Sequence, residues 1–201
     1  MQNFSRSNWK PVEGSHANRY LLIMVVSLAI TVIFTRLYLE LTGYPQLGND
    51  TFHIAHALWG GLCLTVSASL MLIYLNQWIF IVSAVLTGAG LGLFVDEIGK
   101  FITQANDYFF PLAAPLIYIT VLLVVMLYLF IRREDAYEVR SDMYIALDNM
   151  KPLLDQHISQ EQFDDLRIQL HRLAHQTERS EIARMAQGLL DALPAESESL
   201  P

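Results

Sequence analysis

Two histidines and two carboxylates have the spacing that best suits chemistry in this sequence. His53 and His56 lie three residues apart, and Asp96 and Glu97 are adjacent. Imidazole nitrogens and carboxylate oxygens are ligands for zinc and for non-haem iron. A divalent metal held by these four side chains would activate water, for example to hydrolyse a lipid-borne substrate. The first hypothesis is therefore a zinc or iron site, although the sequence contains no His-Glu-x-x-His motif.

Two other hypotheses use the same residues. Histidines titrate near neutral pH, so the cluster is also a candidate proton or ion relay of a transporter or sensor. Alternatively, the charges only pair with one another and hold helices together at a wet interface. Four further residues belong to that ion-pair network: Arg36, Glu40, Lys100 and Asp107.

Four apolar segments must position these side chains. They cover residues 20–41, 52–75, 78–101 and 109–131. Each is close to the roughly 20 residues that cross the hydrocarbon layer as a helix. Backbone polar groups in lipid must be satisfied within the segment, so these segments are helices rather than single strands. The sequence predicts an all-α, four-transmembrane-helix bundle over residues 20–131.

The order of the segments brings the polar residues to one side of the membrane. The ends of the first and third segments and the starts of the second and fourth all lie on the same side. Basic residues concentrate on the other side, both before residue 20 and at Arg132 and Arg133. The positive-inside rule then places both termini, including the segment 1–19, in the cytoplasm. We therefore expect a multi-pass protein of the bacterial inner membrane whose polar cluster faces outward.

Small residues predict how the helices approach one another. Gly88 and Gly92 form a small-xxx-small face, which we expect to meet Gly60 and Gly61 of the second segment. That packing turns the following carboxylate, Asp96, toward the two histidines. Glu97 then points about 100° away, and Arg36 is expected to pair with either Glu40 or Glu97.

Residues 132–201 differ in composition from the membrane segments. The whole chain is 53% hydrophobic and only 16% charged, with a net charge of −7, whereas soluble domains carry about 25% charged residues. Residues 1–133 hold seven basic and six acidic residues, and residues 134–201 hold six and fourteen. This asymmetry excludes a single soluble domain, and the lack of a basic surface argues against nucleic acid as a partner. The single cysteine, Cys63, excludes an internal disulfide.

The acidic tail shows the periodicity of about three amphipathic helices. Apolar residues recur at steps of three and four at positions 139, 143, 147, 150 and 154, at 163, 166, 170 and 173, and at 182, 185, 189 and 193. Ser159 and Gln162 have the spacing of a capping box. Because about sixty residues give a thin core, the tail either packs on itself or serves to oligomerise or to bind a partner protein.

The motifs around the polar cluster also resemble those of a group of proteins. They are His53-x-x-His56-x-Leu-Trp-Gly-Gly, the string Asp96-Glu97-x-Gly-Lys100-Phe-Ile-Thr, and Asn-Asp107-Tyr-Phe. Together they resemble uncharacterised bacterial four-span membrane proteins over residues 52–118, without the tail. The resemblance implies a four-span fold and assigns no activity, so whether the chain is an enzyme stays open.

Overall fold

The computed structural model describes residues 11–42, 48–49, 52–53, 56–98, 111–131, 139–155, 158–176 and 180–194. These residues are helical except for a pair of two-residue strands and short connections. The chain divides into two compact units. One consists of residues 18–134, and the other combines residues 1–17 with residues 135–201.

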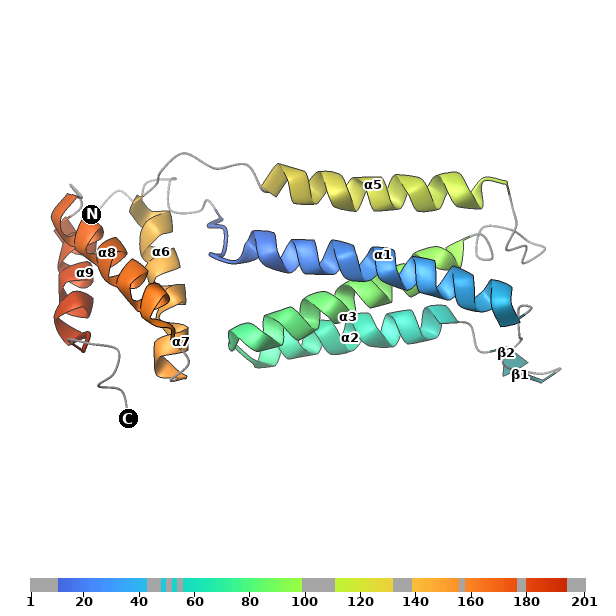
Figure 1. Ribbon diagram of the computed structural model, residues 1–201, viewed down its shortest axis with the longest axis horizontal. Helices are drawn as coiled ribbons and strands as arrows, with labels where there is room; N and C mark the ends of the chain where they lie inside the picture. Colours follow the sequence, from blue (N-terminus) through green and yellow to red (C-terminus); the bar gives the residue numbers. More distant parts are fainter. Residues whose placement is uncertain are drawn as a thin grey trace, which may run out of the picture. The chain divides into compact units, whose positions relative to one another are not determined.

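Four helices of the first unit are long and apolar enough to cross a membrane. They are α1 (Ala17–Thr42), α2 (His56–Ile73), α3 (Gln77–Asp96) and α5 (Ala113–Ile131) (Figure 1). The prediction of four apolar helices is therefore confirmed. Each predicted segment overlaps one of them, and the differences lie at the ends.

The largest differences concern the polar ends of α2 and α3. The second segment was expected to start at residue 52, but Phe52–His53 form strand β2, antiparallel to β1 (Gly48–Asn49), with Gly48 opposite His53. Because the backbone of His53 pairs with β1, this residue does not extend α2, and the predicted helical stripe from His53 to His56 is wrong. Helix α3 ends at Asp96 rather than at residue 101, and Glu97 is its C-cap.

Helices α2 and α3 form a tight antiparallel hairpin (Figure 1). The connection between them, residues 74–76, overlaps the gap between the predicted segments at Asn76, whereas Gln77 already belongs to α3. Gly60 and Gly90 let the two backbones touch, since a Cβ at Gly60 would lie 2.7 Å from the carbonyl oxygen of Gly90. Toward the other end, the buried Ser67 hydroxyl donates to the Ser83 carbonyl oxygen over 2.8 Å and lies 2.7 Å from the Thr87 hydroxyl. Small residues and interhelical hydrogen bonds are the usual means by which helices associate in lipid.

The small-residue face of α3 packs on α1 and not on α2. A Cβ at Gly88 would lie 2.3 Å from the carbonyl oxygen of Met24, and one at Gly92 would lie 2.8 Å from Thr31 Cβ. The predicted contact of Gly88 and Gly92 with Gly60 and Gly61 is therefore wrong. Gly90 meets α2 because it lies about 200° around the helix from Gly88.

The second unit contains α6 (Val139–Asn149), α7 (Lys151–Leu154), α8 (Gln160–Gln176) and α9 (Ser180–Ala192). Its core is formed by Met143, Ala146, Leu166, Leu170, Leu173 and Ala186. The capping box is confirmed. The backbone N–H of Gln162 donates to the Ser159 hydroxyl over 3.3 Å, and the backbone N–H of Ser159 donates to Gln162 Oε1 over 3.0 Å. Three residues of the predicted apolar faces are instead exposed, namely Leu147, Leu154 and Met185.

A short segment before α1 packs on α6 within this unit. The Ser15 hydroxyl donates to Asp148 Oδ2, and Lys151 Nζ lies 2.6 Å from Asp148 Oδ1. Burial raises the pKa of Asp148, but hydrogen bonds from Lys151 and Ser15, with the charges of Lys151 and His16, lower it by more, so the net pKa is lowered.

Asp148 should therefore stabilise the second unit in a pH-dependent way. A carboxyl whose pKa is lower in the folded state contributes stability above its unfolded pKa of about 4 and loses it as the pH falls through the folded value. We expect Asp148→Asn to lower the unfolding midpoint at pH 7 and to make no difference near pH 2. Denaturant unfolding of the full chain in detergent at both pH values measures this. An equal effect at both pH values would contradict the assignment to the ionised carboxylate.

Candidate functional site

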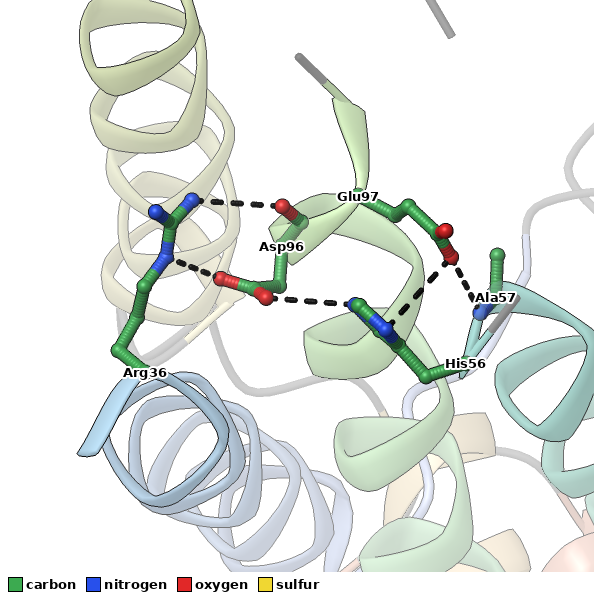
Figure 2. Close-up of polar contacts among 5 residues, drawn as sticks. All are labelled: Arg36, His56, Ala57, Asp96 and Glu97. Carbon is green, nitrogen blue, oxygen red and sulfur yellow. Dashed lines mark hydrogen bonds and ion pairs between the residues drawn. The ribbon is translucent and has the colours of Figure 1, made fainter. Parts of the chain in front are cut away.

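The end of α1, the start of α2 and the end of α3 meet at one end of the first unit. The contacts between α3 and α1 advance in the same chain direction on both helices: Gly88 lies against Met24, and Asp96 contacts Arg36. Contacts of α3 with α2 run in opposite order. Since α1 and α3 are parallel and α2 is antiparallel to both, Arg36, His56 and Asp96 must share one layer (Figure 2).

Asp96 is the centre of this cluster. It follows Gly88 and Gly92 on the α3 face toward α1 and is buried, at 1% exposure. Arg36 Nε donates to Asp96 Oδ1, and Arg36 Nη2 donates to the Asp96 carbonyl oxygen over 3.3 Å. Asp96 Oδ2 lies 3.3 Å from His56 Nε2, and it accepts no hydrogen bond from the residues that the structure describes.

Glu97 faces the N-terminus of α2. Its Oε2 accepts a hydrogen bond from the Ala57 backbone amide over 2.7 Å and lies 3.8 Å from His56 Nδ1. The first amides of a helix have no partner within the helix, and a carboxylate there also interacts favourably with the helix dipole. Glu97 therefore serves as an N-terminal cap for α2 although it belongs to α3.

The His56 ring lies between the two carboxylates, with Nε2 toward Asp96 and Nδ1 toward Glu97 (Figure 2). Both carboxylates are buried, and the contacts shown in Figure 2 supply one permanently charged cation, Arg36. With a neutral imidazole the four side chains carry a formal charge of −1. A cation in this layer would interact favourably with the two carboxylates.

The structure brings together three of the four predicted metal ligands. His56, Asp96 and Glu97 are in contact, whereas only the backbone of His53 is described, in β2. In the predicted ion-pair network, Arg36 pairs with Asp96 rather than with Glu40 or Glu97. Glu40 is exposed and makes no ion pair with another described residue. Lys100 and Asp107 lie outside the described residues.

Sequence reasoning missed two features of this cluster. The Arg36–Asp96 pair required knowledge that the face of Gly88 and Gly92 packs on α1. A signal for that packing was available, because α1 has the small residues Ser27 and Thr31 four residues apart, and small residues mark close helix contacts. The Ala57 amide as a partner of Glu97 had no sequence signal, because it depends on where α2 starts.

An all-helical fold with four membrane-length apolar helices and a buried polar cluster at one end of them is the architecture of multi-pass helical membrane proteins. Comparisons of this chain with protein-family models, curated proteins and solved structures found no match. The resemblance to bacterial four-span proteins therefore stays a prediction, and the function is inferred from the cluster. Within the described residues, no group of three or more His, Cys, Asp and Glu side chains is arranged to hold a metal ion.

Proposed function

We propose that this chain is a multi-pass protein of the bacterial inner membrane, with both termini in the cytoplasm and the Arg36–His56–Asp96–Glu97 cluster facing outward. Within this arrangement the cluster binds a divalent metal ion, zinc or iron. The observation that carries the proposal is an imidazole placed between two buried carboxylates, with His56 Nε2 lying 3.3 Å from Asp96 Oδ2 and His56 Nδ1 lying 3.8 Å from Glu97 Oε2.

The spacing of the donor atoms supports a shared ion. His56 Nε2 and Asp96 Oδ2 are 3.3 Å apart. Two ligands at zinc distances of about 2.1 Å, in tetrahedral geometry, are separated by about 3.4 Å. Asp96 Oδ1 is already held by Arg36, which orients the carboxylate and leaves Oδ2 directed toward His56. His53, three residues before His56, is the proposed third protein ligand.

Glu97 is proposed to orient the imidazole rather than to bind the ion. It lies at Nδ1, on the ring edge opposite to Asp96. Metal-binding histidines usually donate their other ring N–H to a carboxylate or carbonyl, and loss of that partner costs about 10-fold to 100-fold in affinity. Such an ion, when bound, would supply Lewis acidity and activated water to a substrate at the membrane surface.

The metal content of the protein tests this proposal. We expect detergent-purified wild-type protein, equilibrated with Zn²⁺ and desalted, to retain about one ion per chain. His56→Ala should lose it, because one of the two described ligands is removed. Glu97→Gln should bind at least 10-fold more weakly. Elemental mass spectrometry and titration with Zn²⁺ measure both effects.

The tail supplies a matched control for adventitious metal. His171 and His175 stack on the exposed face of α8, with ring centroids 4.2 Å apart, so this surface pair also offers imidazole nitrogens. The double variant His171→Ala/His175→Ala should keep the tightly held ion. Wild-type protein without retained metal, or loss of the ion only in this control, would refute the metal site.

A second candidate function is that of an interaction protein, in which the cluster is only an ion-pair network and the tail recruits a partner or oligomerises. It is favoured by the way the cluster closes on itself, since Asp96 and Glu97 each contact groups from another helix. In that case the role of position 56 is to contact the two carboxylates, which a lysine ammonium can also do. If this is so, we expect His56→Lys to leave the stability of the first unit, residues 18–134, unchanged. If the metal site is correct, the same variant abolishes retained metal.

A further inference from the structure

An apolar stripe on α6 and α7 lies outside the core of the second unit. Tyr144 and Leu147 are the exposed residues of α6, at 57% and 43%, and Leu154 of α7 is 79% exposed. Met150, between the two helices, keeps α-helical angles of φ −79° and ψ −18°, so α7 nearly continues α6. Positions 144, 147, 151 and 154 then follow steps of three and four and share one face.

The chemistry of this stripe is that of an interfacial helix. It combines a tyrosine and two leucines with Lys151, whose ammonium lies 2.6 Å from Asp148 Oδ1 at the edge of the stripe. Tyrosine favours the boundary between hydrocarbon and headgroups, and a lysine can extend its charged end to the headgroups while its stem stays in apolar surroundings. By contrast, the exposed surface of α8 is mainly polar or charged, for example at Glu161, Asp164 and Arg167. Its acidic residues suit water rather than a membrane surface.

The segment that directly precedes α1 is hydrogen-bonded to α6. The Ser15 hydroxyl donates to Asp148 of α6, and Ser15 is two residues before Ala17, where α1 begins. The apolar run of α1 starts at Tyr20, one helical turn later. Five positions along the chain therefore separate the contact with α6 from the start of the apolar run. The link from α5 to α6 is also short, comprising residues 132–138.

We propose that the face of α6 and α7 formed by Tyr144, Leu147 and Leu154 docks on the lipid bilayer surface next to the start of α1. Amphipathic helices of this kind insert their apolar face about 5–10 Å into the boundary between headgroups and acyl chains. The occupant of the stripe is thus the membrane to which the chain is already tethered, and α8 and α9 face the aqueous phase. This inference rests on the proposed membrane crossing of α1 and is independent of metal binding by the cluster.

Environment-sensitive fluorescence at two matched positions tests the proposal. The full chain with Cys63→Ala provides a background without thiols, and Leu154→Cys or Ile168→Cys then carries a single nitrobenzoxadiazole label. Ile168 is the control, because it is an apolar residue of α8 with 59% exposure. Both proteins are reconstituted into phosphatidylcholine–phosphatidylglycerol vesicles, permeabilised to iodide, with and without nitroxide-labelled lipid.

We expect the label at residue 154 to emit at shorter wavelength, to be quenched by the nitroxide lipid and to lose most of its quenching by iodide. The label at residue 168 should emit at longer wavelength, should be quenched by iodide and should not be quenched by the nitroxide lipid. Equal iodide quenching at both positions would overturn the proposal. The proposal would also be overturned if the label at residue 154 were protected from both quenchers and unlabelled Leu154→Cys formed a disulfide between two copies. That result would mean that a second copy of the chain covers the stripe. Unchanged thermal unfolding of each variant shows that the fold is kept.

Discussion

Gly88→Ala should destabilise the first unit, residues 18–134, by about 1–3 kcal/mol, which is the usual cost of overpacking. The new methyl group would lie 2.3 Å from the Met24 carbonyl oxygen and 2.7 Å from Ser27 Cβ. A backbone carbonyl cannot rotate away as a long side chain does, so α1 and α3 must separate. Because the same face carries Asp96, the Arg36–Asp96 pair should be disturbed as well. Unfolding of the full chain by sodium dodecyl sulfate in mixed micelles measures the loss.

Gly61→Ala is the matched control for this prediction. Nothing lies within 4 Å of a Cβ built at Gly61, although the residue is adjacent to the tightly packed Gly60. Alanine has the higher helix propensity, so this variant should be as stable as the wild type or slightly more stable. Equal losses in Gly88→Ala and Gly61→Ala would mean that the α1–α3 contact is not the cause.

Asp96→Asn is the second large effect. It removes the carboxylate that joins Arg36 of α1 to His56 of α2, and an amide cannot pair with the guanidinium charge. Breaking a fully buried ion pair costs about 3–5 kcal/mol. Arg36 is 36% exposed, so part of its charge is solvated without Asp96, and we expect a loss of about 2 kcal/mol. Unfolding in the presence of a chelator separates this effect from metal binding.

Glu97→Gln distinguishes charge from hydrogen bonding in the same cluster. Glutamine keeps an oxygen that can accept the Ala57 amide, so the cap of α2 survives. We therefore expect a smaller loss of stability than for Asp96→Asn, together with the weaker metal binding predicted above. If Glu97→Gln were the more destabilising variant, Glu97 and not Asp96 would be the residue that holds the three helices together.

The cluster shows which parts of a site can be predicted from a membrane sequence. Four apolar segments in alternating direction place the end of the first, the start of the second and the end of the third in one layer. That topology predicted that His56 and Asp96 share this layer. The expectation that Glu97 points away from the histidines was wrong, because Glu97 contacts His56 and the Ala57 amide. Which residue of a neighbouring helix each carboxylate contacts could not be predicted. Asp96 and Glu97 are adjacent on a helix and point about 100° apart, so the rotation of α3 decides which carboxylate meets which helix.

The sequence by itself determined the number and approximate extent of the apolar helices, the turn at Asn76 and the capping box at Ser159, because these depend on local composition and hydrogen bonding. Only the tertiary structure decided that Gly88 and Gly92 face α1, that α2 begins at His56, and that Leu147 and Leu154 lie outside the core. Periodicity shows that a helix has an apolar face. It does not show what covers that face, because lipid and another helix select for the same apolar side chains.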